Sequence, residues 1–533
     1  MKIEFVGGAG TVTGSSYIVK NREFTIMVDC GMFQGKRELK ERNFLNLIYD
    51  PPQIDALLLT HAHIDHSGLI PKIVKEGYNN PIFATDATTE LCSVMLPDSA
   101  HIQEMDNAWI NRRQKKLGRD PVPMLYSTQD ALAAQQFFRP VKYGEMVQIH
   151  PKVRARFRDA GHILGSSFIE MWIEENGATM KIVFSGDIGS KDQVIIRDPE
   201  AIEDADVLLI ESTYGDRLHK NRQDTYDEFK QIILDAYNKK GNIVIPSFAI
   251  ERTQEIIFTL GRLFKSGELP RIPVYIDSPL AISATEIFKK YEHVFHDDTR
   301  QIHLSGDDPL SFPNLYYTKT TEESKRLNDT AKGTIIISAS GMCTAGRIKY
   351  HLQNNLYRPE SSVIFVGYQA EGTLGRKLVD GEKRVKIYGE DVVVRANVHT
   401  LGGFSAHADR DGLLDWMSTI KNDRLKVFVV HGEENAAMSF AGSIRNRFGF
   451  DAVVPSWGET VDLATMGRAV VPYGGRETTP VDSEIEQLAV NMKRLQEKYR
   501  AAKGENRLFQ LKRLEQDIND LNEMIRMVTD DLG

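Results

Sequence analysis

The chain has 533 residues, more than a single hydrophobic core usually organises, so we expect two or more domains. Its composition, 41% hydrophobic and 26% charged, is ordinary for a soluble globular protein. A formal net charge of −8 argues against a broad electrostatic coating of nucleic acid, so any such substrate must be held in a groove with its own basic groups or metals.

The cysteine and hydropathy patterns restrict the class of protein further. Cys30, Cys92 and Cys343 are scattered and odd in number, so a disulfide framework is not expected. No apolar run is long enough to span a bilayer, and the opening residues, MKIEFVGG, predict a strand and not a signal peptide. These features predict a cytoplasmic protein that has no membrane partner.

Residues 1–215 alternate short apolar strands with turns and a few helices. Each predicted strand ends in a polar or glycine-rich stretch, so we expect the loops to gather on one rim of the sheets. The glycines of GGAGTVTG (7–14) suggest a dinucleotide-binding fingerprint. Thr13, however, stands where the third glycine of that fingerprint belongs, and no helix pattern follows. A tight turn between strands is the better interpretation.

Residues 57–70, LLLTHAHIDHSGLI, place four candidate metal ligands directly after a buried strand. His61, His63 and Asp65 alternate at a spacing of two, which suits an extended loop that turns alternate side chains toward one centre, while His66 closes from the other side. Imidazole nitrogens and a carboxylate are ligands that zinc and similar divalent metals prefer. The motif predicts a metal site; the alternative is a polar turn with incidental histidines.

Two basic stretches follow. One is RRQKK at residues 112–116, and the other is the alternating set Arg154, Arg156 and Arg158 on a predicted strand. Both could contact a nucleic-acid backbone, because lysine and arginine neutralise phosphates. Both could equally be solvated surface, and the sequence leaves these alternatives open.

Two further candidate ligands lie in loops of the same first region. His162 stands in the glycine-flanked loop DAGHILGSS, and Asp187 follows a buried strand in VFSGDIGS. The small neighbour Gly186 leaves room for a metal beside Asp187. Each residue alone is a weak indication, because a lone histidine or aspartate at a strand end is usually satisfied by its surroundings.

Residues 216–390 change to repeated strand–helix units, which predict a largely parallel sheet and a second domain. In SASGMCTAGR, Ser340, Gly341 and Met342 are expected between a strand and a helix, where backbone N–H groups at the helix N-terminus can bind a phosphate. Arg347, one turn further on, could pair with the same phosphate. The alternative is a plain glycine-rich turn.

The first pattern resumes in residues 391–475. His407 lies in FSAHAD, and His431 follows a buried strand in VFVVHGEEN. Together with the residues of the first region, His431 supplies enough donors for two centres of four protein ligands, provided that Asp187 bridges the two.

Residues 476–533 show apolar side chains at helical spacings on both sides of a break at Gly504–Asn506. Two amphipathic helices joined by a glycine turn predict a helical hairpin. Its apolar seam must be buried, either on the rest of the chain or against a second copy in a homodimer or larger homo-oligomer.

The metal-ligand pattern resembles the metallo-β-lactamase superfamily. The resemblance rests on HxHxDH at 61–66, then His162 and Asp187, with Asp29 after the second strand. It implies an αββα sandwich that binds two zinc ions, with manganese as an alternative metal. One ion would be bound by His61, His63, His162 and Asp187, and the other by Asp65, His66, Asp187 and His431. Asp29 would orient a ligand from behind, a role that fixes ligand geometry.

Three motifs resemble the β-CASP branch of that superfamily, which contains nucleases such as RNase J and the endonuclease subunit of the eukaryotic cleavage and polyadenylation machinery. They are Glu211 in LLIESTYG, His407 in FSAHAD and His431 in VVHGE. The resemblance implies a sandwich built from 1–215 and 391–475, with a parallel α/β β-CASP domain inserted at 216–390. The tail at 476–533 is not part of the pattern.

The resemblance also implies hydrolysis of RNA phosphodiester bonds, with Asp65, Glu211 and His407 as catalytic residues. A metal pair binds the scissile phosphate and lowers the pKa of a bridging water. His407 would protonate the leaving 3′ oxygen while Glu211 holds its ring. Members acting on DNA tend to lack the last histidine, so His431 favours RNA.

Two departures and three alternatives remain. Glu251 stands where relatives often carry glycine, and His399 has no assigned role. A hydrolase of DNA would share most of the motifs. A hydrolase of a small-molecule ester or thioester would share the metal motif but would need neither the insertion nor the Glu211–His407 pair. An inactive scaffold would be expected to lose metal ligands, and this chain retains them.

Overall fold

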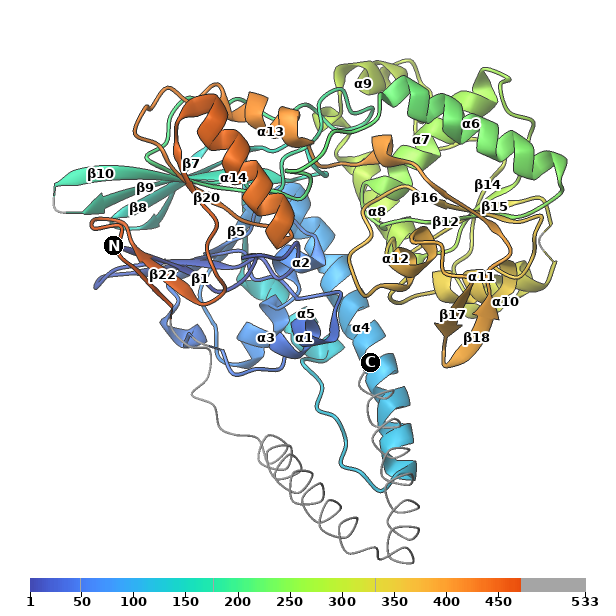
Figure 1. Ribbon diagram of the computed structural model, residues 1–533, viewed down its shortest axis with the longest axis horizontal. Helices are drawn as coiled ribbons and strands as arrows, with labels where there is room; N and C mark the ends of the chain where they lie inside the picture. The colour runs from blue at the N-terminus through green and yellow to red at the C-terminus, as the bar shows by residue number, and fades with distance from the viewer. Residues whose placement is uncertain (48, 176, 331, 471–533) are drawn as a thin grey trace, which may run out of the picture. The chain divides into compact units, whose positions relative to one another are not determined.

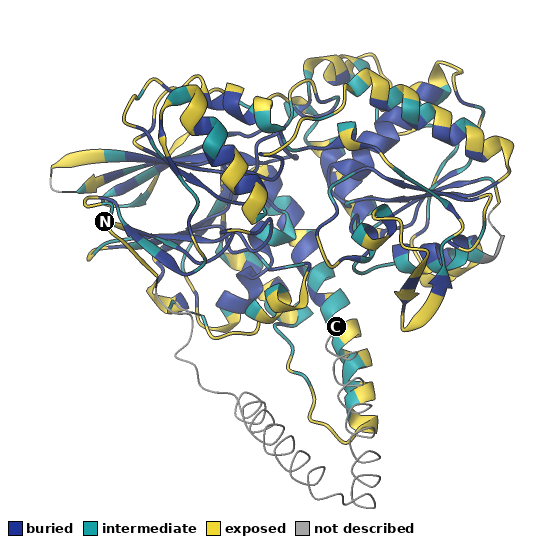
Figure 2. Cartoon of the chain, viewed as in Figure 1, coloured by how far each residue is buried: buried dark blue, intermediate teal, exposed yellow. Residues whose placement is uncertain are grey.

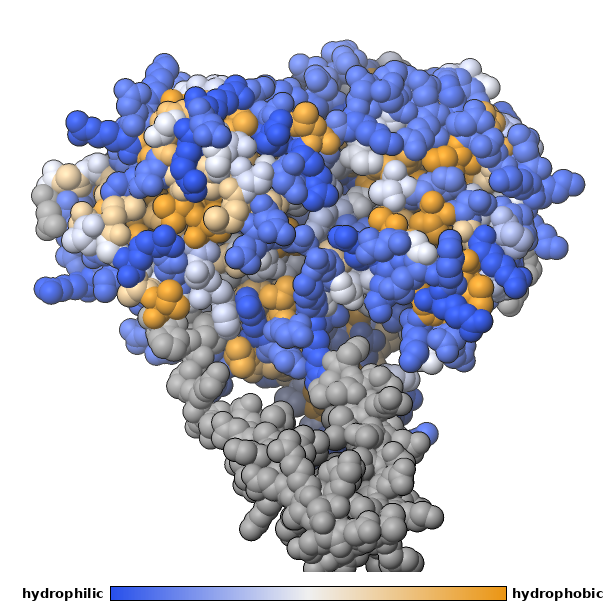
Figure 3. All heavy atoms as spheres, in the orientation of Figure 1, coloured by the Kyte–Doolittle hydropathy of each residue, from blue (hydrophilic) through white to orange (hydrophobic). Residues whose placement is uncertain are grey.

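The computed structural model describes residues 1–470 apart from 48, 176 and 331, and these residues build two mixed sheets that face each other and a separate parallel sheet (Figure 1). The helical hairpin predicted at 476–533 lies outside the described residues. Among the described helices, none combines the length and apolar character that a membrane span requires. The face of the molecule drawn in Figure 3 is mainly hydrophilic, with scattered hydrophobic side chains.

The first of the facing sheets has eight described strands in the order β23-β22-β1-β2-β3-β4-β5-β6. Strands β3 to β6 run parallel, whereas β1 pairs antiparallel with β2 and β22. The bounds are β1 (Lys2–Phe5), β2 (Tyr17–Lys20), β3 (Thr25–Val28), β4 (Ala56–Leu58), β5 (Ile82–Thr85), β6 (Phe138–Val141), β22 (Glu459–Asp462) and β23 (Arg468–Val470).

The second facing sheet has seven described strands in the order β21-β20-β11-β10-β9-β8-β7. It joins the chain before the insertion to the chain after it, because β11 pairs parallel with β20. The bounds are β7 (Met146–His150), β8 (Val153–Asp159), β9 (Ser167–Glu175), β10 (Ala178–Phe184), β11 (Val207–Ile210), β20 (Lys426–Val429) and β21 (Asp451–Val453).

Helices cover the outer faces of both sheets, which completes an αββα sandwich. The short strand β4 is apolar throughout because both of its faces are buried. Leu58 lies in the core between the sheets, and Leu57 lies in the core beneath the helices. The helices are α1 (Arg37–Arg42), α2 (Ile64–Ser67), α3 (Ile70–Lys75), α4 (Asp86–Lys116) and α5 (Thr128–Ala134) on one side, with α13 (Arg410–Met417) and α14 (Glu434–Phe448) on the other.

The inserted domain contains a described six-stranded sheet, β14-β13-β15-β12-β16-β19, in which every pairing is parallel, as the strand–helix pattern predicts. A hairpin of β17 (Arg384–Ile387) and β18 (Glu390–Val393) stands beside it. The strands are β12 (Ile243–Pro246), β13 (Val274–Ile276), β14 (Leu315–Tyr317), β15 (Ile335–Ser338), β16 (Ser362–Phe365) and β19 (Asn397–Thr400).

Strand β19 extends the inserted sheet past the boundary predicted at residue 390. It pairs with β16 through Val363↔Val398, so the chain leaves this sheet only after Thr400. The hydropathy pattern could not show this, because β19 reads like a strand of either domain. The helices of the insertion are α6 (Arg222–Asn238), α7 (Arg252–Lys265), α8 (Pro279–Lys290), α9 (Asp297–Leu304), α10 (Thr321–Thr330), α11 (Ile348–Asn355) and α12 (Leu374–Val379).

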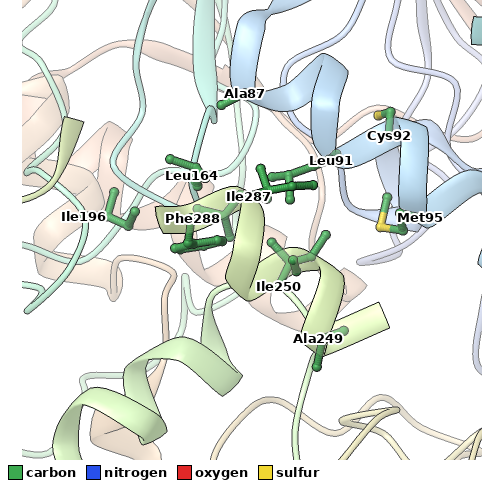
Figure 4. Close-up of a cluster of buried hydrophobic side chains, with 14 of the residues drawn as sticks. Ala87, Leu91, Cys92, Met95, Leu164, Ile196, Ala249, Ile250, Ile287 and Phe288 are labelled. Atoms are coloured by element: carbon green, nitrogen blue, oxygen red, sulfur yellow. The ribbon is translucent and has the colours of Figure 1, made fainter. Parts of the chain in front are cut away.

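A shared apolar cluster fixes the inserted domain to the sandwich. Ala249 and Ile250, from the loop between β12 and α7, lie in one cluster with Leu91 and Met95 of α4 (Figure 4). Leu164, two residues after His162, belongs to the same cluster. These side chains are buried, and Figure 2 shows the same dark interior throughout the described residues. The cluster therefore connects the β12–α7 loop to the loop that carries His162.

Candidate metal centre

The candidate ligands lie where strands of the sandwich end. Asp187 follows β10, His431 follows β20, and His61 comes three residues after β4. His162 lies in the loop between β8 and β9. Because parallel strands of a sheet present their carboxyl ends at one edge, residues that are distant in sequence meet there.

The first donor group contains the four residues expected to bind one ion, His61, His63, His162 and Asp187, whose donor atoms lie within 4.8 Å of one another. Nδ1 of His63 lies 3.1 Å from Nε2 of His61 and 3.3 Å from Nε2 of His162. Oδ2 of Asp187 lies 3.5 Å from both of those Nε2 atoms. The lone pairs of these side chains therefore converge.

The second donor group contains Asp65, His66 and His431, whose donor atoms also lie within 4.8 Å of one another. The other carboxylate oxygen of Asp187, Oδ1, lies 3.3 Å from Nε2 of His66 and 3.4 Å from Nε2 of His431. One oxygen of Asp187 thus faces each group. This is the arrangement that a bridging carboxylate requires.

The buried donor atoms fit a bound cation. Oδ1 of Asp187 and Nε2 of His66 are buried and have no hydrogen-bond partner among the described residues. Burial lowers the pKa of His63 to about 3 and that of His431 to about 4, so both rings are neutral and offer a lone pair. Burial would also lower the pKa of His66, but the carboxylates of Asp187 and Asp29 raise it well above its usual value. The site therefore attracts positive charge.

Asp29, which the family resemblance implies as an orienting residue, lies beside His66. Its Oδ2 accepts from Nδ1 of His66 at 2.8 Å, which leaves Nε2 of His66 facing Asp187. Thr60 adds a contact that the sequence analysis missed: its hydroxyl donates to Asp29 at 2.9 Å and lies 3.1 Å from Nδ1 of His61. A polar residue just before HxHxDH was the signal available for it.

Ser15 is a second residue that the sequence analysis missed. Its hydroxyl lies 2.6 Å from Nδ1 of His431, so Nε2 of that ring is the nitrogen directed at Asp187. Ser15 follows the glycine-rich stretch 7–14, which forms a turn between β1 and β2 and in which the backbone carbonyl of Gly8 accepts from the N–H of His431 at 2.6 Å. The glycine-rich turn therefore orients a metal-ligand candidate from the far end of the chain.

Glu211 and His407 form the expected pair. Both carboxylate oxygens of the buried Glu211 lie near Nδ1 of His407, at 3.1 and 3.2 Å. Burial alone would lower the pKa of His407, but the carboxylates of Glu211 and Asp187 raise it to about 9. The ring also lies 4.4 Å from that of His162. A protonated histidine therefore stands beside the first donor group. Because Glu211, His407 and Asp187 also have donor atoms within 4.8 Å of one another, this geometry alone is compatible with a ligand role for His407 as well.

A cavity of about 760 Å³ opens beside both donor groups and runs between the sandwich and the inserted domain. It reaches the candidate ligands and also the loops before α7 and α11. Among the residues that line it are His63, Asp65, His162, Asp187, His407, His431, Phe248, Ser340, Met342 and Arg347.

The predicted phosphate-binding turn is only partly as expected. Ser340, Met342 and Arg347 line the cavity, but α11 begins at Ile348, so residues 339–347 form a loop and no helix N-terminus lies at Ser340. The N–H of Ser340 donates to the carbonyl of Ala345 at 3.2 Å. Several small polar residues here favour internal hydrogen bonds over an early helix start. Gly341 instead gives space to the ring of Phe248.

The remaining residues named in the sequence analysis lie in the following places in the structure. Arg156 lies 2.7 Å from Glu170, Arg154 lies within salt-bridge distance of Glu174, and Arg158 pairs with Glu200, so each of the three arginines already has an acidic partner. The RRQKK stretch is largely exposed at the end of α4. Glu251 has a φ of 68°, in the left-handed region that favours glycine. His399 lies on β19.

The fold and the paired donor groups define a metal-dependent hydrolase. Comparison with family models agrees: residues 9–89 match the metallo-beta-lactamase superfamily, 253–378 the Beta-Casp domain, and 391–455 the Zn-dependent metallo-hydrolase RNA specificity domain. The chain belongs to the β-CASP branch of the metallo-β-lactamase superfamily.

Relatives that match most of this chain support this assignment. Ribonuclease TTHA0252 of Thermus thermophilus is 36% identical over 471 residues, which cover 88% of this chain and 100% of that protein. Transcription termination factor FttA of Methanocaldococcus jannaschii is 29% identical, over 85% of this chain and 70% of that protein. FttA of Methanococcus maripaludis is 30% identical with the same coverage.

Proposed function

We propose that the protein is a zinc-dependent ribonuclease that hydrolyses RNA phosphodiester bonds with two metal ions and a histidine general acid. The observation that carries the proposal is the Asp187 carboxylate, which directs one oxygen at each of two buried donor groups. The RNA specificity family model and the ribonuclease among the relatives support RNA as the substrate.

Two ions would be held by this chain, zinc by preference and manganese as an alternative. His61, His63, His162 and Oδ2 of Asp187 would bind the first, and Asp65, His66, His431 and Oδ1 of Asp187 the second. When bound, such a pair would neutralise charge on the scissile phosphate and supply a nucleophilic water at neutral pH. The chain's own contribution is to hold the ligands: Asp29, Thr60 and Ser15 fix the ring orientations of His66, His61 and His431.

His407 would donate the proton that the leaving 3′ oxygen needs. Its Nδ1 is held by Glu211, so Nε2 is the nitrogen left to donate. The buried carboxylate keeps the ring protonated at neutral pH and returns it to that state after each turnover. His407 also lines the cavity, where the substrate must enter.

Arg347, Ser340 and Met342, which line the cavity, would contact the RNA on the side of the inserted domain, whereas Gly341 lies under the ring of Phe248. Arg347 is held in place because its Nη1 donates to Asp277 at 2.6 Å. A pre-positioned guanidinium loses little side-chain freedom on binding a phosphate. We further propose that the protein acts in the cytoplasm and that residues 476–533 mediate self-association.

The test is metal content measured beside the rate of RNA cleavage for three variants. His407→Ala should keep both ions and bind RNA, but cleave about 10²–10⁴-fold more slowly, the usual contribution of a general acid. His431→Ala should lose the second ion and be partly rescued by added zinc or manganese. Asp187→Ala should lose both ions.

Two results would contradict this division of roles. Restoration of His407→Ala by excess metal would make that residue a ligand, and a full metal pair in Asp187→Ala would exclude the bridge. A DNA strand of the same sequence and a thioester are the comparison substrates. Faster hydrolysis of either by the metal-loaded wild type would replace the ribonuclease proposal.

A further inference from the structure

Phe248 presents an aromatic ring to the cavity beside the first donor group. It lies in the loop between β12 and α7, is only partly buried, and lines the same cavity as the candidate ligands. Its ring centroid lies 6.3 Å from that of His63. An apolar ring at this distance contributes nothing to metal binding, so its place in the cavity needs another explanation.

The ring of Phe248 packs against the backbone of two glycines. A Cβ at Gly341 would lie 2.7 Å from the Phe248 ring, closer than real Cβ atoms come, and one at Gly367 would lie 3.4 Å from it. One side of the ring therefore rests on the backbone of the loops after β15 and β16. Any side chain at Gly341 would have to displace the ring.

The backbone that carries Phe248 is also fixed. Its carbonyl accepts from the hydroxyl of Thr253 at 2.7 Å and from the N–H of the same residue at 3.2 Å. The next two residues, Ala249 and Ile250, are buried in the cluster that joins the inserted domain to α4 (Figure 4). The ring is therefore positioned before a substrate arrives, and little freedom is lost on binding.

We propose that Phe248 forms a nucleobase subsite, in which its ring stacks on the base of a nucleotide next to the scissile phosphate. The inference rests on the proposed ribonuclease function and adds the part of the substrate recognised there. A phosphate held at the donor groups brings the bases of its two flanking nucleotides close to His63. An uncharged aromatic surface suits a base and not the phosphate backbone, and stacking accepts all four bases because each has a π-face.

The test combines variants of Phe248 with RNA that lacks one base. End-labelled single-stranded RNA first locates the scissile phosphate, and an abasic nucleotide is then placed on its 5′ side, on its 3′ side, or several nucleotides away. The variants are Phe248→Ala, Phe248→Leu, which keeps most of the volume without the ring, and Phe248→Trp. Phe44→Ala is the matched control, because Phe44 lines the same cavity and is 50% exposed.

Loss of one stacked base should lower kcat/KM about 5- to 150-fold. Phe248→Ala and Phe248→Leu should show this loss on intact RNA with full metal content. Phe248→Trp, which keeps an aromatic face in a closely packed position, should lose less than Phe248→Leu, and Phe44→Ala should not show the loss. Wild type should show the same loss on RNA that is abasic on one side of the scissile phosphate. The abasic substrate should cost the Phe248→Ala enzyme nothing further, since the two changes remove one interaction.

The subsite would be overturned if the loss caused by Phe248→Ala and the loss caused by the abasic nucleotide multiplied when the two were combined. It would also be overturned if Phe248→Leu cleaved intact RNA at the wild-type rate. If Phe248→Ala does not retain metal, the cleavage rate of Phe248→Leu on intact and abasic RNA decides the test. Failure of the ribonuclease proposal looks different: metal-loaded wild type would leave every RNA uncut, with or without its bases.

Discussion

Replacing Glu211 with glutamine should separate the charge of this residue from its hydrogen bonds. Oε1 of Glu211 accepts from the N–H of Ile188 at 2.7 Å and lies 3.1 Å from Nδ1 of His407. The amide oxygen of glutamine can replace Oε1 in both contacts. The two contacts of Oε2, with Nδ1 of His407 at 3.2 Å and with the N–H of Thr213 at 3.3 Å, would be lost, because the amide nitrogen that takes its place cannot accept a hydrogen bond. The variant should therefore fold and bind metal, with one negative charge fewer beside the proposed acid.

The size of the effect follows from the groups around His407. Burial lowers its pKa, and the carboxylates of Glu211 and Asp187, with a smaller effect of Asp65, raise it to about 9. Because bound cations would offset the charges of Asp187 and Asp65, Glu211 is the partner that still acts in the loaded enzyme. At pH 7.5 a histidine of pKa about 9 is about 97% protonated, whereas one at the ordinary ~6.5 is about 10% protonated. Because the pKa of about 9 also includes the attraction of Asp187 and Asp65, which bound cations would offset, Glu211→Gln should cost on the order of tenfold at that pH.

The pH dependence of kcat tests the direction of this effect. A general acid works only when protonated, so the rate falls as the pH rises through its pKa. The fall in kcat, measured from pH 5.5 to 10 under saturating metal, should come at a lower pH in Glu211→Gln than in wild type, and His407→Ala should lack it. The same descending limb in wild type and Glu211→Gln, at equal metal content, would refute the role assigned to Glu211.

Two other predictions concern the second donor group and the tail. Ser15→Ala should weaken binding of the second ion by about 10- to 100-fold, because Nδ1 of His431 loses the hydroxyl that fixes its ring; zinc titration measures this, and unchanged affinity would contradict it. Deletion of residues 476–533 should reduce the oligomer size in light scattering and leave the metal content intact. An unchanged size would favour packing of the tail on its own chain.

Local sequence was sufficient for the part of the site that is local. His61 to His66 follow β4 directly, so the strand that positions them is visible in the same few residues. The repeated strand–helix units likewise predict the parallel sheet of the insertion, because helical and extended periodicities differ. The family resemblance supplied the pairing of Glu211 with His407, which no spacing in the sequence implies.

Contacts between distant segments were the part that could not be predicted. Ser15 and His431 are 416 residues apart, and nothing in GGAGTVTGSS shows which loop it will face. The expected helix start after Ser340 failed for a related reason. The backbone conformation of residues 339–347 is set by packing against Phe248 and by hydrogen bonds within the loop. It depends on tertiary contacts and not on local helix propensity.

The proposed acid and the second donor group depend on the same return of the chain. Strand β20 pairs with β11 in a register that sets Ile210 opposite Val429, so Glu211 and His431 both lie just beyond this pairing. His407 joins the loop after β10, where the N–H of Ala408 donates to the carbonyl of Ile188 at 2.7 Å. Asp187 stands immediately before that carbonyl. The insertion therefore lies between the segment that brings the first donor group and the segment that brings both the acid and His431. The segment of His407 attaches to the loop of the bridging carboxylate, whereas His431 is held by the pairing of β20 with β11 and by Gly8 and Ser15. One returning part of the chain therefore positions the acid and the second donor group through separate contacts, so a change at one set of contacts can disturb one of them and leave the other in place.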